Sequence, residues 1–211
     1  KVGVAWLGSI ELGTWESLVL GMRCKDGIIL AGTKKISYGY LVISQIGRAV
    51  EVIDNIGFAF SGHVADLQSL LKEIKMEMSY LKYTLGRPLT ISAIANRLGL
   101  ILYSWKLFPY ITFALVGGYD KIPEEKPRLY SLDPVGSVIE EDYAASGVSA
   151  EVAIGLLEDR YHKDITVEEA QKLAVDAMKA VARRDVLAGR YIDVAIIKKD
   201  SSELKTVTLE V

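Results

Sequence analysis

LGMRCKDGIILA, at residues 20–31, is the stretch that decides the fold of this chain. Lys25-Asp26-Gly27 in its middle is a turn signal, and the segments on either side of the turn have the apolar character of strands. The pattern predicts two strands, residues 17–24 and 27–32, joined by a tight turn. Together they form the hairpin on which the rest of the fold is built.

The remaining elements come in groups. Further strands are predicted at residues 40–45, 49–53, 56–61, 111–117, 128–132, 137–139, 191–198 and 204–209. Helices are predicted at residues 65–85, 90–106, 149–162 and 166–184.

Three of these helices carry clear sequence signals. The helix at 65–85 has an apolar stripe that runs from Leu67 to Leu85, and Thr90 is the expected cap of the next helix. The helix at 166–184 opens with Thr166 and Glu169, which have the spacing of a capping box. Helices that occur in pairs between groups of strands indicate two stacked antiparallel sheets with a helix pair on each outer face.

Composition limits the classes of function. The chain has 211 residues, enough for one domain with a substantial core, and a net charge of −2 that offers no surface for nucleic acid or an anionic membrane. Its single cysteine, Cys24, fits a reducing cytoplasm and is expected to pack as a small apolar residue. With only His63 and His162 as histidines, we expect neither a metal site nor a cofactor.

Several short stretches, in a fixed order, resemble one family. They are the opening strand pair at 20–31, then Phe60-Ser61-Gly62-His63-Val64-Ala65-Asp66, Gly117-Gly118-Tyr119-Asp120, residues 129–136, Tyr143-Ala144-Ala145-Ser146-Gly147, residues 155–158, Arg183-Arg184-Asp185 and Ile192-Asp193-Val194. Together they resemble β-type subunits of the 20S proteasome, and archaeal ones most closely.

The resemblance implies a fold, a chemistry and a set of partners. The fold would be the α+β, four-layer αββα sandwich of the N-terminal nucleophile hydrolases. Active members cleave a propeptide before a threonine, whose hydroxyl then attacks peptide carbonyls with its own free amine as base. The implied partners are proteasome α-ring subunits and catalytic β subunits in heptameric rings, with protein substrates inside the chamber.

Most positions of the family's active site hold other residues in this chain. Ser17 stands at the nucleophile, four residues before Gly21, and is preceded by Glu16 where glycine is usual. The remaining replacements are Thr33 for the strand aspartate, Ala49 for the lysine, and Val148 and Ala188 for the two orienting serines. Arg48 adjoins Ala49, but side chains alternate along a strand, so we expect it to point away.

Only two positions keep the residue that the family uses. They are Gly62, whose backbone N–H would hold the oxyanion, and Asp185. Because a nucleophilic hydroxyl depends on a base and a nearby cation, we expect a non-catalytic subunit.

We expect residues 1–16 to be an unprocessed, propeptide-like extension and residues 17–211 to be the β-type domain. The alternative is an active threonine- or serine-type endopeptidase that uses Thr14 or Ser17. Gly13-Thr14 is the dipeptide at which the family cleaves, but Thr14 lies three residues too early, about 10 Å along a strand. A third possibility is a homomeric scaffold that is derived from the family and acts outside proteasomes.

Overall fold

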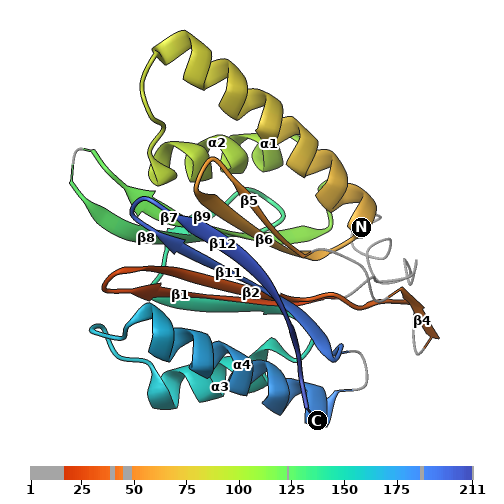
Figure 1. The fold of residues 1–211 in the computed structure, drawn as a ribbon. Helices are drawn as coiled ribbons and strands as arrows, with labels where there is room; N and C mark the ends of the chain where they lie inside the picture. Colours follow the sequence, from red (N-terminus) through yellow and green to blue (C-terminus); the bar gives the residue numbers. More distant parts are fainter. Residues whose placement is uncertain (1–16, 39–40, 45–48, 123, 186–187, 211) are drawn as a thin grey trace.

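A computed structural model of the chain describes residues 17–38, 41–44, 49–122, 124–185 and 188–210. Two five-stranded antiparallel sheets lie face to face, and a pair of helices covers each outer face (Figure 1). The predicted four-layer αββα architecture of the α+β class is therefore confirmed.

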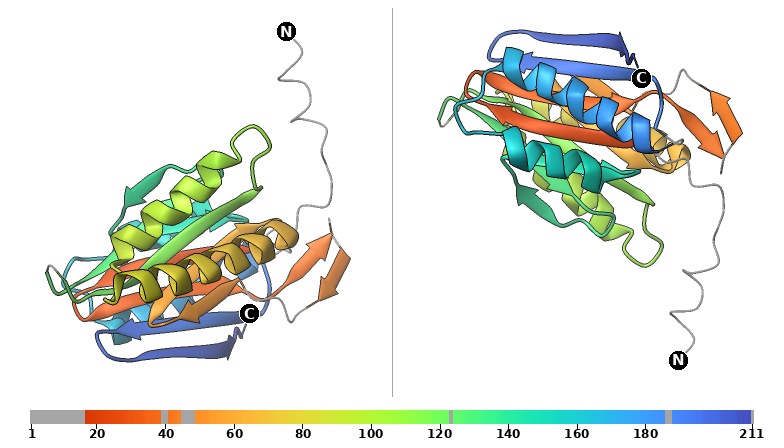
Figure 2. Two further views of the ribbon diagram at one scale, coloured as in Figure 1. Left: turned by 90° about the horizontal axis from the view of Figure 1, so that it is seen from above. Right: turned by 90° about the horizontal axis from the view of Figure 1, so that it is seen from below.

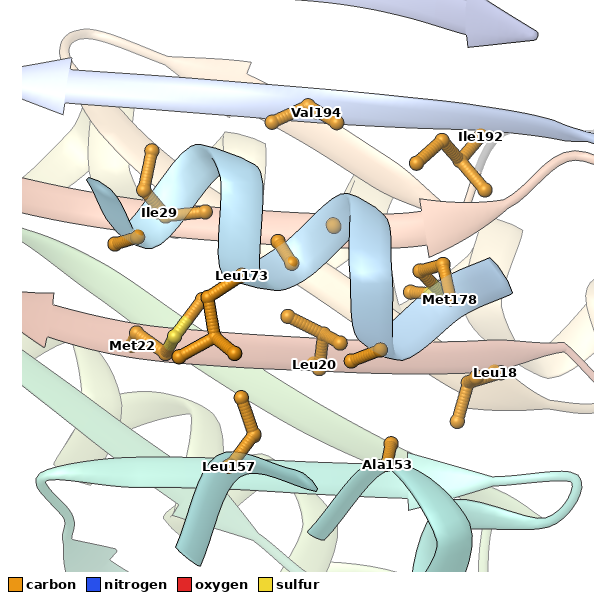
Figure 3. Packing of buried hydrophobic residues seen from close by; sticks show 14 of the residues in the cluster. Leu18, Leu20, Met22, Ile29, Ala153, Leu157, Leu173, Met178, Ile192 and Val194 are labelled. Atoms are coloured by element: carbon orange, nitrogen blue, oxygen red, sulfur yellow. The ribbon is translucent and has the colours of Figure 1, made fainter. Parts of the chain in front are cut away.

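The first sheet contains the hairpin from which the prediction started. Its strands, in spatial order, are β10 (Tyr143–Gly147), β1 (Leu18–Cys24), β2 (Gly27–Thr33), β11 (Tyr191–Lys198) and β12 (Ser202–Thr208). Helices α3 (Ala150–Arg160) and α4 (Val167–Arg184) pack on its outer face. Figure 3 shows Leu20 and Met22 of β1 pointing to the side where Leu157 of α3 and Leu173 of α4 lie.

The second sheet has the strand order β5 (Val50–Ile53), β6 (Ile56–Gly62), β7 (Thr112–Asp120), β8 (Lys126–Leu132) and β9 (Val138–Glu140). Helices α1 (Val64–Leu85) and α2 (Ile91–Ser104) pack on its outer face. A separate hairpin of β3 (Ile36–Tyr38) and β4 (Leu41–Ser44) projects from one end of the sandwich (Figure 2).

Glycines allow the two sheets to pack closely. A Cβ atom added at Gly57 of β6 would lie 2.6 Å from Leu30 Cδ1 of the opposite sheet, and one at Gly117 of β7 would lie 2.7 Å from Ile28 Cγ2. Real Cβ atoms essentially never approach other atoms so closely, so a side chain at either position would force the opposite sheet's side chain to shift. The space that glycine leaves is filled by large apolar side chains, which form the intersheet core together with Val19, Ala49, Val50, Ala59, Leu115, Leu129, Ala195 and Ile197.

The predicted caps occur at the helix ends. The Thr90 hydroxyl accepts a hydrogen bond from the backbone N–H of Ala93 (3.1 Å), and the Thr166 hydroxyl accepts one from the backbone N–H of Glu169 (3.2 Å). The backbone N–H of Thr166 in turn donates to the Glu169 carboxylate, which completes the capping box. Helix α1 ends at Gly86, whose φ of 59° is the left-handed conformation typical of glycine after a helix. Its N–H donates to the carbonyl of Lys82.

Two strands were missed, and several boundaries differ from the prediction. β10 was not expected, because Tyr143-Ala144-Ala145-Ser146-Gly147 lacks the alternation that marks a half-buried strand. β3 was also missed.

Helix α2 ends at Ser104 rather than at residue 106, and Leu85, the last residue of the predicted apolar stripe of α1, is exposed. Residues 40 and 45 of the predicted strand 40–45 lie outside the described residues.

Cys24 packs as predicted, as a small apolar residue in the core between the first sheet and its helices. Burial raises the pKa of its thiol to about 12. In the described part of the chain, no helix combines the length and the apolar character needed to cross a membrane.

Core packing under α3 yields a stability prediction. Leu157 is fully buried against the first sheet, whereas Val152 on the same helix is 38% exposed. Leu157→Ala should lower the free energy of unfolding by about 2–5 kcal/mol, because the cavity adds to the lost transfer energy. Val152→Ala should change it by roughly 0.5 kcal/mol or less. Urea unfolding of both variants measures the difference, and equal values would contradict the assigned packing.

Candidate functional site

Ser17, the expected nucleophile position, directly precedes β1 and is half-buried. Its hydroxyl donates a hydrogen bond to the carbonyl oxygen of Phe60 on β6, at 3.2 Å. A carbonyl oxygen does not act as a general base, so this contact holds the hydroxyl without activating it. As long as residues 1–16 remain attached, the nitrogen of Ser17 is an amide rather than a free amine.

Thr33 occupies the aspartate position at the end of β2. It is buried, and its hydroxyl oxygen accepts a hydrogen bond from the backbone N–H of Leu18 at 3.0 Å. The side chain thus fixes the first residue of β1 to β2. It supplies a neutral hydroxyl at a position where the resemblance implied a carboxylate.

Ala49 occupies the lysine position and belongs to the intersheet core. It is 5% exposed, and a Cβ added at Gly32 of β2 would lie 3.0 Å from the Ala49 methyl group. The carbonyl of Ala49 accepts a hydrogen bond from Phe60 N at 2.8 Å. A methyl group in apolar packing therefore stands where the family's ammonium group would be. Arg48, expected to point away, lies outside the described residues.

Gly62, the expected oxyanion glycine, also has a structural reason to be glycine. Its φ of 124° is rarely adopted by other residues, and an added Cβ would overlap the carbonyl oxygen of Ile111. That same carbonyl accepts the N–H of His63 at 2.8 Å. The presence of glycine here is thus explained by the fold alone.

Asp185, the surviving carboxylate, is bound to a residue that the sequence reasoning missed. Ser149 donates its hydroxyl proton to Asp185 Oδ2, with an oxygen–oxygen distance of 2.5 Å. Ser149 has a φ of 49° and lies directly before α3, while Asp185 caps the C-terminus of α4. A serine at the start of a predicted helix signals an N-cap, so the sequence pattern gave no indication of a bond across 36 positions.

The two orienting positions are apolar in structure as well as in sequence. Val148 is buried beside Ser149, and Ala188 packs against the core under α3 and α4. The N–H of Ala188 donates to the carbonyl of Asp185 at 3.2 Å. The structure thus brings the expected site residues to one end of the sandwich, but the groups that meet there are mainly methyl groups and hydroxyls.

Lys34 directly follows Thr33, so its ammonium group could serve the site only if it pointed toward Ser17. Its ammonium group lies 3.1 Å from the buried carboxylate of Asp193 on β11, and Thr206 of β12 donates to the same carboxylate oxygen at 2.6 Å. β11 and β12 lie on the other side of β2 from β1. The ion pair between Lys34 and Asp193 therefore lies on the far side of β2 from Ser17.

A hydroxyl pair and a cavity adjoin the site. Ser61 Oγ and Ser146 Oγ are 3.0 Å apart and link β6 to β10, which belong to different sheets. Beyond them lies a cavity of about 370 Å³, with Phe113, Leu115, Tyr143 and Ser146 among its lining residues. The alternative nucleophile Thr14 lies outside the described residues.

Comparison with known proteins gives a consistent result. The family model for proteasome subunits matches residues 16–197. The chain is 40% identical to proteasome subunit beta 1 of Hyperthermus butylicus, over 93% of this chain and 96% of that protein. It is 42% identical to proteasome subunit beta 1 of Ignicoccus hospitalis, with coverage of 90% and 96%, and 40% identical to proteasome subunit beta 2 of Pyrobaculum aerophilum, with coverage of 90% and 93%.

The hydrogen bond between Ser149 and Asp185, together with the positive φ of Ser149, predicts that a glycine variant at position 149 is more stable than an alanine variant. Ser149→Ala should lower the free energy of unfolding by about 1.5 kcal/mol, because it removes a hydrogen bond to a charged group. Ser149→Gly removes the same bond but accepts a φ of 49° without the Cβ penalty of roughly 1 kcal/mol. Chemical unfolding should therefore rank the glycine variant above the alanine variant. The reverse order would mean that backbone strain at Ser149 is negligible.

Proposed function

The chain belongs to the proteasome subunit family, and from this premise we propose that it is a β-ring subunit of the 20S core particle that hydrolyses no peptide bonds itself. As a β subunit it takes part in protein degradation. Its own contribution is to form ring contacts and chamber wall beside catalytic β subunits, in heptameric rings stacked on α rings. The single cysteine, which is buried and unpaired, fits the cytoplasm as the location.

The surroundings of Ser17 are the observation that carries this proposal. Its hydroxyl bonds to a carbonyl oxygen, and the lysine position, Ala49, is a methyl group in the intersheet core. A serine hydroxyl needs a base to remove its proton and a cation to stabilise the resulting charge. Members of such a site act as a unit, and loss of a single one typically lowers the rate by orders of magnitude.

The retained residues support the same reading. Gly62 is required by its backbone conformation, and Asp185 holds the turn before α3 through Ser149. Both have structural roles that persist without catalysis.

Exposed apolar side chains support a role in assembly. On α1, Met76, Tyr80 and Tyr83 are spaced to form one exposed stripe, and Leu107 and Phe108 are exposed after α2. Contiguous apolar surface of this kind marks interaction sites, and permanent interfaces bury about 2,000 Å² or more with an apolar centre. A subunit needs such surfaces for assembly, whereas its active site is a separable property of the fold.

Peptide hydrolysis tests the proposal directly. Particles assembled from this chain as the only β subunit, together with α subunits, should not cleave fluorogenic peptides. The matched controls are the same particles with Ser17→Ala or Thr14→Ala, which should give the same background rate. Turnover that either substitution abolishes would establish the alternative, a threonine- or serine-type endopeptidase.

Processing is tested by intact mass. We propose that residues 1–16 stay attached to the 17–211 domain, because self-cleavage needs the same nucleophile and lysine as catalysis. The subunit from mature particles should retain its extension, and Glu16→Gly alone should not restore cleavage, since the remaining positions are unchanged. A dominant species that begins at Thr14 or Ser17 would refute this.

A further inference from the structure

β12 (Ser202–Thr208) is the last strand of the first sheet, and Figure 2 shows it along the outer side of the molecule. It pairs with β11 on one side in a single register without a bulge, and no other described strand pairs with its opposite side. The strand contains neither proline nor glycine, the residues that most often interrupt an edge. β12 therefore offers a regular strand edge to a partner.

The two ends of the β11–β12 ladder show which backbone groups of β12 point outward. The N–H of Leu209 donates to the carbonyl of Arg190, and the N–H of Lys198 donates to the carbonyl of Ser201. Residues in an antiparallel pair alternate between bonded and non-bonded positions, so the odd-numbered residues of β12 bond to β11. The N–H and C=O groups that point away from β11 belong to the even-numbered residues Ser202, Leu204, Thr206 and Thr208.

The charged side chains of β12 fit a second copy of the same strand. Glu203 and Lys205 are exposed on one face of β12, where they form an ion pair at 2.8 Å. A lysine alone at a sheet edge opposes pairing with another strand. When two β12 strands run antiparallel with Leu204 of one copy opposite Leu204 of the other, however, each Glu203 lies opposite the other copy's Lys205.

The register centred on Leu204 also satisfies the backbone. It places outward-pointing residues opposite one another, with Ser202 of each copy opposite Thr206 of the other. A two-fold axis at Glu203 would oppose two carboxylates, and one at Lys205 would oppose two ammonium groups, which destabilises a strand pair. The register centred on Leu204 is therefore the one in which hydrogen bonds and charges agree.

We propose that two copies of this chain associate through their β12 edges, antiparallel and centred on Leu204, and so join two five-stranded sheets into one continuous sheet. The occupant of the edge is a second copy, because the strand is complementary in charge to itself in this register. Such a contact is isologous and closes at two copies, so it differs from the heterologous contacts that build a ring. The inference goes beyond the proposed function and does not depend on it.

Charge exchange along β12 tests the register. Sedimentation velocity of the full-length chain should show a concentration-dependent equilibrium between monomer and dimer. Glu203→Lys and Lys205→Glu, each alone, should weaken the dimer roughly ten-fold, because two attractions between the copies become two repulsions. The double variant, Glu203→Lys with Lys205→Glu, should restore the original dissociation constant. Glu124→Lys, which breaks a similarly exposed ion pair with Lys126 of β8, should leave it unchanged.

The backbone contact is tested by proline. Ser202→Pro removes an outward-pointing N–H at the first residue of an edge strand, where proline is tolerated, so the dimer should weaken while the fold persists. Ser202→Ala keeps this N–H and should dimerise like the original chain. Circular dichroism establishes which variants are folded, and the charge exchange remains decisive if the proline variant is not.

Three outcomes would overturn the inference. They are a chain that stays monomeric at every concentration, a dimer that neither single charge reversal weakens, and a weakened dimer that the double variant does not restore. A monomer whose β12 edge is protected from amide hydrogen exchange only by another polypeptide would assign the edge to a different partner and falls under the first outcome. Peptide hydrolysis by assembled particles, by contrast, tests the proposed function alone.

Discussion

Close packing of the two sheets at glycine positions is the constraint on which the other features depend. Because Gly57 and Gly117 leave room for Leu30 and Ile28 of the opposite sheet, the two sheets pack closely over a core of buried apolar side chains. Position 49 lies in this core. An isolated ammonium group there would be costly unless a carboxylate faced it, whereas the methyl group of Ala49 packs in the apolar core without that cost.

The same packing explains why fragments of the family's site persist. The hydrogen bonds of Ser17, Thr33 and Ser149 each connect a site position to another element, namely β6, the start of β1 and the end of α4. They hold the end of the sandwich together with neutral hydroxyls and one carboxylate. This arrangement preserves the shape that a ring subunit needs. Among the described residues at these positions, no cation pairs with a carboxylate in a way that would lower the proton affinity of Ser17.

The sequence predicted those features that depend on residues close to one another along the chain. The capping box at Thr166, the stripe of α1 and the Lys25-Asp26-Gly27 turn were all readable, as was the order of layers. β10 was missed because its small residues become a strand only by pairing with β1, more than a hundred positions earlier. The Ser149–Asp185 contact and the pairing of Lys34 with Asp193 join distant segments, so no spacing rule indicated them. The site positions were found through family resemblance, and the structure supplied their surroundings.

A mixed particle provides the most direct test of the central claim, that this subunit contributes surfaces and no chemistry. The measurement is peptide hydrolysis by particles that contain this chain, α subunits and a catalytic β partner whose nucleophile has been replaced by alanine. The account predicts that particles of full size form and that hydrolysis falls to background. Residual turnover that disappears on Ser17→Ala in this chain would contradict it.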